Sequence, residues 1–574
     1  MQSKNSPDFQ KILSILAKLK TQKAESLDEE KTLSRFDEAV QLTEFLKEKP
    51  IQAGKKSIRR QHQKNRMTVW ERLDVLCGSN KTLLHPNWGK HLDGASLVTA
   101  ITQINGRDVG VYGHDFTVRA GSMDASNGKK LKHFFDVVLK NKIPVIGMND
   151  SAGAYVPAGV GGLDSYSLSF LGLRQLSGVV PSMMCMFGFN AGGGSYLPRQ
   201  GSFIIQPKNT FFGLTGVSVI KNVLGEEVTP DELGGPSVHA ESGAADYVVE
   251  DEVEALNLCK TLLNILPDHN SISAPFRETK DPIDRLTLES EGLLRHIINS
   301  PTGYNTPFDI SVFVADICDE RQTTEFQPNR ARNSFCAWGR LGGHVVGFCA
   351  NNSAVASGQI DLNAAYKKAR FIRFCNLYNI PLIFMEDTTG FLPGKEQEKR
   401  GIVQAGRAML DAILDLRVPR ILVLIRNAFG GAYASFNNYA TGADWVIALP
   451  TTRVAVMGPA GIEFVYKEEI QRAHGEKNQQ LKAIKNELIA AGQSVVEAEE
   501  IALKESDVWF KNQMQFLSSR YEQELLNPKE ALSLGSISEI IAPQYLRRAL
   551  ASKISFCLRH YVPSPMAGTQ REFH

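Results

Sequence analysis

The sequence repeats itself at an offset of 237 positions, and this duplication constrains the fold more than any other feature. The stretch NGRDVGVYGHDFTV (105–118) aligns with GGHVVGFCANNSAV (342–355), and KIPVIGMNDSAG (142–153) aligns with NIPLIFMEDTTG (379–390). Unrelated segments do not keep one register over so many positions, so we predict two copies of one structural unit. The identical pairs include Gly106/Gly343, Gly110/Gly347, Pro144/Pro381, Asp150/Asp387, Gly153/Gly390 and, after a shift of one residue, Gly192/Gly430 and Gly193/Gly431.

Within each copy, short apolar runs alternate with an amphipathic segment. DVGVYGHD (108–115), IPVIGMND (143–150) and VVPSMMCMFGF (179–189) have the length and composition of buried strands, and a loop is expected between the last two. NGKKLKHFFDVVLKN (127–141) has its apolar residues at helical spacing. Apolar strands separated by a helix predict α/β domains with covered sheets.

The chain is too long for one core, and the repeat suggests where it divides. We predict an N-terminal helical leader over 1–67, a first domain over 68–285 and a second domain over 286–574, with the boundary near SAPFRETKDPID. A stretch of the second domain, about 466–526, lies outside the repeat. Its charges are balanced as on long exposed helices, so we expect an inserted helical hairpin that contacts another subunit.

Composition excludes several classes of partner. With 64 Lys and Arg against 62 Asp and Glu, the net charge of +2 argues against nucleic-acid and membrane-surface binding. One basic run, KKSIRRQHQKNR (55–66), either receives a phosphate or is a solvated linker. A signal-peptide core and long apolar runs are missing, so we expect a cytoplasmic protein. The eight cysteines form no CxxC pair and HExxH is absent, so we expect reduced thiols and no metal.

Each copy contains a glycine-rich turn directly after an apolar run. If a helix begins in NAGGGSY (190–196), its first amides have no partner within the helix, and the missing side chains let a ligand oxygen approach them. Such amides, assisted by the helix dipole, form an oxyanion hole. A tight packing turn between a strand and a helix is the alternative. The turn fits neither GxSxG nor GxGxxG, so two oxyanion holes without an obvious nucleophile indicate chemistry between two enolate-like reactants.

These motifs resemble the carboxyltransferase β subunits of biotin-dependent acyl-CoA carboxylases, of the propionyl-CoA and methylcrotonyl-CoA carboxylase type. The related glutaconyl-CoA decarboxylase α subunit is similar as well. The resemblance covers roughly residues 68–550. In the first half it rests on GHDFTVRAGSM, IPVIGMNDSAGAYVPAGV, FGFNAGGGSYLP and GLTGVSVIKNVLGEEVTPDELGG, and in the second half on IPLIFMEDTTGFLPGKEQEKRGIVQAGRAML, FGGAY, AVMGPAGIEFVYKEEI and NPKEALSLGSISEII.

The resemblance implies two crotonase-like (ββα-spiral) domains in a hexamer. The active site would lie where the first domain of one subunit, which binds acyl-CoA, meets the second domain of another, which binds carboxybiotin. The family pattern assigns amides for the thioester enolate to Gly192, Gly193 and Gly194, and amides for the biotin ureido oxygen to Gly430, Gly431 and Ala432. It assigns further substrate contacts to Ala152, Gly153, Ala154, Tyr196, Tyr433 and Ala434.

Three positions depart from the family pattern. Ala434 stands where the family has an acidic or a bulky aliphatic residue, which suggests room for a longer or branched acyl chain. Tyr155 stands where an arginine is expected. DTTG (387–390) is closer to the methylcrotonyl and glutaconyl-CoA decarboxylase types, although the following FLPG is of the propionyl type. The identity of the acyl-CoA is therefore left open.

The resemblance also implies partners. The chain has no MKM biotinylation motif and no ATP-grasp loop, so a biotin carboxyl carrier and a biotin carboxylase subunit would complete a carboxylase. For a decarboxylase, the resemblance implies the biotinylated carrier and a membrane sodium pump. Three hypotheses stay open. The chain is the carboxyltransferase subunit of a carboxylase, or it runs the reverse half-reaction as a decarboxylase α subunit or transcarboxylase core, or it is an inactive scaffold of such a complex.

Overall fold

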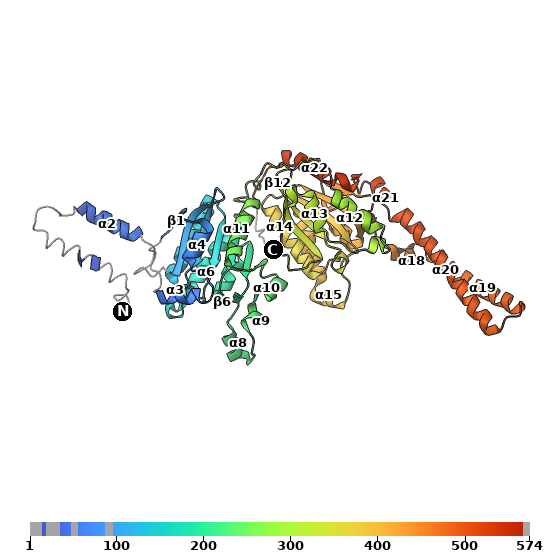
Figure 1. Cartoon of the computed structure of the whole chain (residues 1–574), viewed down its shortest axis with the longest axis horizontal. Helices are drawn as coiled ribbons and strands as arrows, with labels where there is room; N and C mark the ends of the chain where they lie inside the picture. Colours follow the sequence, from blue (N-terminus) through green and yellow to red (C-terminus); the bar gives the residue numbers. More distant parts are fainter. Residues whose placement is uncertain (1–13, 16, 19–34, 48–54, 86–95, 566–574) are drawn as a thin grey trace, which may run out of the picture.

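The computed structural model describes residues 14–15, 17–18, 35–47, 55–85 and 96–565. In Figure 1 two β-sheets with their helices lie side by side along the long axis, and a helical hairpin extends beyond the second sheet. Within the predicted leader, the described helices are α2 (Arg35–Lys47) and α3 (Lys55–His62). The rest of the leader prediction up to residue 54, apart from residues 14–15 and 17–18, lies outside the described residues.

The first sheet has seven strands in the order β1-β2-β3-β4-β5-β7-β9. The first three strands pair antiparallel, and the following strands pair parallel. A separate parallel pair, β6 with β8, continues beyond β5 and β7. The strands are β1 (Lys81–Leu83), β2 (Leu97–Ile104), β3 (Arg107–His114), β4 (Val145–Asn149), β5 (Ser182–Met186), β6 (Phe189–Ala191), β7 (Phe203–Pro207), β8 (Phe211–Gly213) and β9 (Tyr247–Val249).

The second sheet repeats this arrangement strand for strand. Its order is β10-β11-β12-β13-β14-β15-β17, again antiparallel for the first three strands and parallel afterwards, with β16 paired to the end of β14. The predicted α/β fold of two duplicated units is confirmed. The strands are β10 (Thr323–Glu325), β11 (Ser334–Leu341), β12 (His344–Asn351), β13 (Leu382–Thr388), β14 (Arg420–Phe429), β15 (Trp445–Ala448), β16 (Arg453–Ala455) and β17 (Glu539–Ile540).

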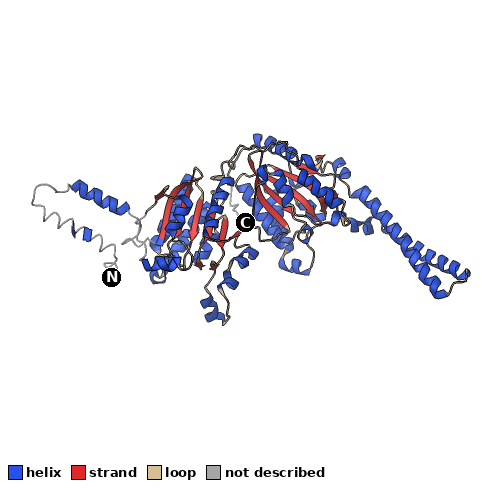
Figure 2. Cartoon of the chain, in the orientation of Figure 1, coloured by secondary structure: helices blue, strands red, loops and turns tan. Residues whose placement is uncertain are grey.

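Helices cover both faces of the sheets, as expected for buried parallel strands (Figure 2). The helices of the first unit are α4 (Val69–Cys77), α5 (Ala125–Asn141), α6 (Val160–Leu176), α7 (Gly193–Arg199), α8 (Val217–Leu224), α9 (Pro230–Gly234), α10 (Pro236–Ser242) and α11 (Glu252–Ile265). In the second they are α12 (Leu288–Ile298), α13 (Ser311–Ile317), α14 (Leu362–Leu377), α15 (Lys395–Arg400), α16 (Ile402–Leu414), α17 (Gly430–Ser435), α18 (Ile462–Val465), α19 (Lys467–Ala490), α20 (Val495–Leu525), α21 (Pro528–Ser533) and α22 (Leu546–His560).

The loop expected between the second and third apolar runs of the first unit is wrong, because the structure has helix α6 there. The glycines of this segment lower its helical signal, but they let α6 pack closely against α5. A Cβ on Gly172 of α6 would lie 2.6 Å from the ring of Phe135, and one on Gly128 of the facing helix α5 would lie 2.4 Å from Cα of Ser165. The second unit has α16 at the equivalent place.

The two units share one apolar core. A single buried cluster runs from β5, β7 and α11 of the first unit to α14 and β11 of the second. The ring of Phe203 lies 4.8 Å from that of Phe374 and 5.7 Å from that of Trp338, measured between centroids. On α14, Arg370 donates to the buried Asp246 carboxylate at 2.9 Å. The units are thus joined by packing and a buried ion pair.

The hairpin of α19 and α20 projects from the second unit (Figures 1 and 2). Its base packs on Phe429, the residue that ends β14, through Tyr466, Leu517 and Tyr521. The Tyr521 hydroxyl donates to the carbonyl oxygen of Met457 at 2.9 Å. The hairpin is therefore anchored beside the second glycine turn. Of the helices that the structure describes, none has the length and hydrophobicity needed to cross a lipid bilayer.

Candidate active site

The first glycine turn joins β6 to α7. Gly192 has a φ of 56°, a left-handed conformation that favours glycine, and its amide donates to the carbonyl oxygens of Gly213 at 3.1 Å and Leu214 at 3.2 Å. Within the described part of the chain, the amides of Gly193 and Gly194 donate to no acceptor. These are the first amides of α7, which have no partner within the helix. Two of the three predicted donors are thus available, and that of Gly192 is occupied.

Packing also requires glycine at these positions. A Cβ on Gly193 would lie 2.5 Å from Cγ of Tyr166, and one on Gly194 would lie 2.9 Å from the carbonyl oxygen of Ser151. Tyr166 and Ser151 are themselves joined by a hydrogen bond of 3.1 Å between their hydroxyl groups. The tight packing turn considered as an alternative in the sequence analysis is therefore present. It is compatible with the free amides, because both features follow from the close approach of the turn to Tyr166 and Ser151.

The predicted substrate loop, Ala152 to Ala154, lies against this turn. Gly153 has a φ of 101°, and a Cβ there would lie 3.1 Å from the carbonyl oxygen of Ala191. Its amide donates to Oγ of Ser151 at 3.2 Å. Tyr196, on α7, is 53% exposed. The structure thus brings the loop together with the Gly192–Gly194 turn and leaves Tyr196 accessible.

Asp150, directly before this loop, is held by two arginines that the sequence did not single out. Its Oδ2 accepts from Nη1 of Arg72 at 2.9 Å and also contacts Nη2 of Arg66. Arg72 also pairs with Glu252 at 2.7 Å. Burial alone would lower the pKa of Arg72, but Asp150 and Glu252 raise it, so the guanidinium stays charged. The basic run at 55–66, which ends at Arg66, was the available signal for this contact.

The second glycine turn joins β14 to α17. Gly430 has a φ of 58°, like Gly192, and a Cβ there would lie 3.1 Å from the carbonyl oxygen of Val456. Within the described residues, the amides of Gly430, Gly431 and Ala432 donate to no acceptor. A Cβ on Gly431 would meet no atom within 4 Å. Among the described residues, this turn is the more open of the two, because a side chain at position 431 would meet no neighbour.

Asp387, the repeat equivalent of Asp150, is also held by an arginine, which in this unit comes from the neighbouring strand β14. Arg426 of β14 donates to it through Nη2 at 2.7 Å and through Nε at 3.2 Å, and both side chains are buried. The amide of Asn427 donates to the same carboxylate at 3.2 Å. Beyond the turn, Tyr433 is partly buried and Ala434 is exposed. Each unit therefore anchors the strand end beside its glycine turn through one buried carboxylate.

Apolar side chains are exposed around both turns. Leu214, whose carbonyl oxygen accepts from Gly192, is 65% exposed, and Val456, beside Gly430, is 85% exposed. Two apolar residues at equivalent places are costly to leave in water and indicate surfaces that a partner or ligand covers. Other exposed apolar residues nearby in the chain are Val156, Val160 and Leu163 in the first unit and Val403 and Phe464 in the second.

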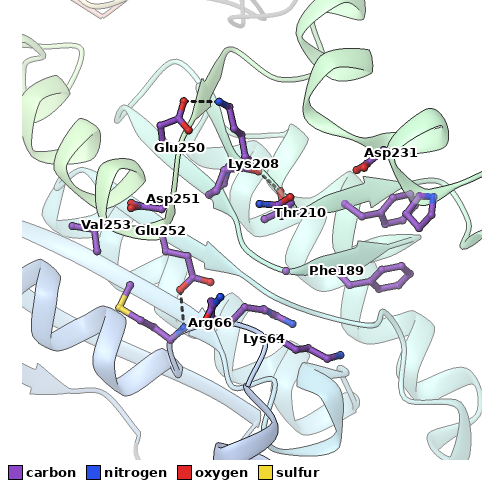
Figure 3. A pocket seen from close by; sticks show the side chains of 17 residues that line it. Lys64, Arg66, Phe189, Lys208, Thr210, Asp231, Glu250, Asp251, Glu252 and Val253 are labelled. Atoms are coloured by element: carbon purple, nitrogen blue, oxygen red, sulfur yellow. Dashed lines mark hydrogen bonds and ion pairs between the residues drawn. The ribbon is translucent and has the colours of Figure 1, made fainter. Parts of the chain in front are cut away.

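A cavity of about 840 Å³ lies beneath the start of β6. In Figure 3 the side chains of Phe189, Arg66, Lys208 and Glu250 are among those around it. Lys208 pairs with Glu250 at 2.6 Å, and Glu252 accepts from the amide of Met67 at 3.0 Å. Several of its charged groups are therefore neutralised within the wall. None of the residues predicted for the site lines this cavity.

Tyr155, which replaces an expected arginine, lies close to a different one. The guanidinium carbon of Arg119 is 4.8 Å from the centroid of the Tyr155 ring. Arg119 also pairs with Asp124 at 3.1 Å. A cation is thus present beside this loop, although it comes from another segment. Within the described residues, no group of three or more His, Cys, Asp or Glu could hold a metal ion.

Known proteins share this arrangement. A model of the Carboxyl transferase domain family matches residues 60–568. The mitochondrial propionyl-CoA carboxylase β chain of Sus scrofa is 36% identical over 441 residues, which cover 74% of this chain and 81% of that one. The methylmalonyl-CoA decarboxylase α subunit of Veillonella parvula is 36% identical over 430 residues, covering 72% and 83%. The solved transcarboxylase 12S hexamer with hydrolysed methylmalonyl-CoA has a TM-score of 0.79 at 31% identity, covering 94% of this chain and 99% of that chain.

Proposed function

The chain belongs to the carboxyl transferase domain family, and we propose that it moves CO2 between biotin on a carrier protein and the α or vinylogous γ carbon of an acyl-CoA. The chain is an enzyme of the biotin-dependent acyl-CoA carboxylase, decarboxylase and transcarboxylase group. The observation that carries the proposal is the pair of equivalent turns with free helix-start amides, one in each unit.

We assign one turn to each reactant. The amides of Gly193 and Gly194 stabilise the thioester oxygen of the acyl-CoA as it becomes an enolate. Each such donor lowers the activation barrier by about 3 kcal/mol. Gly192 shapes this turn rather than donating, since its amide is bonded to Gly213 and Leu214. Ala152, Gly153 and Ala154 line the thioester side of the turn.

The second turn fits the ureido oxygen of biotin. Among the described residues, its three amides, of Gly430, Gly431 and Ala432, have no acceptor, and no atom lies within 4 Å of a Cβ placed on Gly431. When bound, carboxybiotin would supply the CO2, and the biotin that remains would supply the base for the α proton. The protein's contribution is to hold the two oxygens in place and to exclude water around the transferred CO2.

The site is completed by a second subunit. Both turns open onto exposed apolar side chains, Leu214 in the first unit and Val456 in the second, which indicates that each turn is covered in the assembled protein. The transcarboxylase 12S relative is described as a hexamer assembly. We propose a homohexamer in which the first unit of one subunit faces the second unit of another, with Tyr196 and Tyr433 flanking the reactants.

The acyl group is proposed to be propionyl or larger. Ala434 is small and exposed, so it does not fill the space beside the second turn. The methylmalonyl-CoA decarboxylase relative and the propionyl-CoA carboxylase relative act, by their names, on branched or three-carbon acyl groups. The two relatives are equally similar to this chain, at 36% identity, and one of them is named as a decarboxylase. The reverse reaction, in a decarboxylase α subunit or a transcarboxylase core, is therefore the second candidate function.

The partners depend on the direction of the reaction. As a carboxylase, the chain would work with a biotin carboxyl carrier and a biotin carboxylase. The cytoplasmic location stays a prediction, because the Sus scrofa relative is a mitochondrial protein.

Decarboxylation of CoA esters with free biotin tests the proposal. Purified protein should release CO2 from malonyl-, methylmalonyl-, glutaconyl- or methylglutaconyl-CoA only when biotin is added. Inactivity with all four esters would favour the scaffold hypothesis and overturn the proposal. A pull-down from the native host then decides the direction: an ATP-grasp subunit in the complex indicates a carboxylase, and its absence beside a membrane pump indicates a decarboxylase.

A further inference from the structure

The second unit contains two buried charged residues that the first unit does not have. Lys368 on α14 and Glu386 on β13 are both fully buried. At the repeat offset, the first unit has Leu131 and Asn149 in these places. The neighbouring lysine, by contrast, is duplicated: Lys130 donates to the carbonyl oxygen of Leu97 at 2.6 Å and Lys367 to that of Ser334 at 2.8 Å. The two charged residues are therefore specific to the second unit, although the surrounding strands and helices are common to both units.

Lys368 lies against the residue that follows α17. Its Nζ is 4.1 Å from the centroid of the Phe436 ring, which is also fully buried. The Phe436 ring stands edge-on to that of Phe384, with centroids 5.5 Å apart. Phe384 precedes Glu386 by two residues on β13, so both point to the same face of the sheet. Phe436 is thus held between α14 and β13.

Glu386 supplies a negative charge near this contact. Burial raises the pKa of Tyr433, the aromatic residue within α17, and the charge of Glu386 raises it further. Phe436 directly follows Ser435, the last residue of α17. The contact between Lys368 and Phe436 therefore fixes the C-terminal end of this short helix, and Glu386 provides the opposite charge on β13.

The pair is costly to bury. Among the described residues, Nζ of Lys368 and both carboxylate oxygens of Glu386 have no hydrogen-bond partner. Burial lowers the pKa of Lys368 and raises that of Glu386 well above its usual range, and each charge partly offsets the shift of the other. Buried charges of this kind persist when they compensate each other, and removing one partner leaves the other exposed to the full cost of burial.

We propose that Lys368 is a positioning residue for the biotin-side turn, holding the C-terminal end of α17 through Phe436 so that the Gly430, Gly431 and Ala432 amides stay aligned, and that Glu386 is the buried counter-charge of Lys368. The inference rests on the proposed function only for its assignment of this turn to biotin. The first unit, where α7 is seated directly by Tyr166 against Gly193, has no need of the pair.

The test compares three variants with the wild-type protein. Lys368→Met and Glu386→Gln each remove one charge while keeping the length of the side chain, and the double variant removes both. Lys129→Met, on the exposed side of α5, is the matched control for losing a lysine. Thermal unfolding and size-exclusion chromatography select folded protein, and Phe436→Leu gives a further variant that keeps both charges but loses the ring contact.

Two measurements are made on each variant. Hydrogen exchange followed by mass spectrometry should show faster exchange at 429–440 in each single variant and unchanged exchange at 192–200, which contains α7. In the free-biotin decarboxylation assay, each single variant should raise the KM for biotin or lower kcat by roughly tenfold, while the KM for the CoA ester stays within about twofold. The double variant should match Lys368→Met in both measurements, because the cation beside Phe436 is absent from both, but it should recover most of the lost Tm, because no uncompensated charge remains.

The outcomes separate the two ideas. Single variants that exchange like the wild type at 429–440, or that change the KM for both substrates alike, would overturn the positioning role. A double variant with a Tm no higher than those of the single variants would overturn the compensation between the charges. A wild-type protein without biotin-dependent activity would contradict the proposed function, and the exchange measurement would still decide whether the pair seats α17.

Discussion

Replacing Gly193 with alanine should destabilise the protein, whereas the equivalent change at Gly431 should not. A Cβ at position 193 would lie 2.5 Å from Cγ of Tyr166, while at position 431 no atom lies within 4 Å. Tyr166 has little freedom to move aside, because its ring is buried and its hydroxyl bonds to Ser151 at 3.1 Å. Overpacking of this kind costs about 1–3 kcal/mol, and each kcal/mol lowers Tm by about 2–4 °C in a domain of this size.

Both variants should lose transfer activity, for different reasons. At position 193 the displaced turn misplaces its amides, and one misplaced donor lowers kcat by about 10²–10³-fold. At position 431 the added methyl group enters the open space beside the amides while the fold is unaffected, so kcat should fall with Tm unchanged. Scanning fluorimetry and the free-biotin decarboxylation assay on the same preparations measure both effects. A Gly193→Ala variant with the wild-type Tm, or a Gly431→Ala variant with the wild-type rate, would refute this reasoning.

Three further outcomes are expected. Asp387→Asn should cost about 3–5 kcal/mol in urea denaturation, because it leaves the buried guanidinium of Arg426 without its counter-charge; an unchanged midpoint would contradict this. Burial lowers the pKa of His114 from 6.5 to about 4, so between these pH values the unfolded chain binds a proton that the folded chain does not. The free energy of unfolding should therefore fall by up to about 3 kcal/mol as the pH is lowered from 6.5 to 4. His114→Gln should flatten this part of the pH profile, and an equally steep profile would exclude His114 as the cause. Alkylation of the native protein followed by mass spectrometry should modify at most Cys77 and Cys557, since the other six thiols are buried; rapid labelling of those six would show a more open fold.

Much of the fold could be predicted because the duplication is visible as matching local sequence motifs at a constant offset. The strands at 107–114 and 344–351 and the helix at 125–141 carry their own apolar periodicity, and the repeat fixes that both units share one topology. Helix α6 was missed because its glycines serve contacts with α5, and those contacts are invisible in a single segment. Intrinsic propensity was overridden by packing in this case.

The site was predictable only in part, for a similar reason. The glycine turns could be located because a strand, a glycine run and a helix follow one another directly, and the structure begins α7 at Gly193 and α17 at Gly430. Their assignment as oxyanion holes stays a prediction. The arginines that hold Asp150 lie 84 and 78 residues away from it, so no local pattern connects them.

The loss of Gly192 as a donor could not be foreseen either. Its amide bonds to Gly213 and Leu214, which become its neighbours only because β6 pairs with β8. The sequence identifies which amides begin a helix. Which of these amides stay free depends on whether carbonyl oxygens of a neighbouring strand accept from them. Long-range pairing is therefore the information that sequence patterns lacked.

The most direct test is a structure of the assembled protein with an acyl-CoA and biotin bound. The account predicts that the thioester oxygen lies about 3 Å from the amides of Gly193 and Gly194, and that the biotin ureido oxygen lies at a similar distance from amides of Gly430, Gly431 and Ala432 of a neighbouring subunit. Glycine turns that are too far apart for biotin to reach the thioester, in every pairing of subunits, would contradict it.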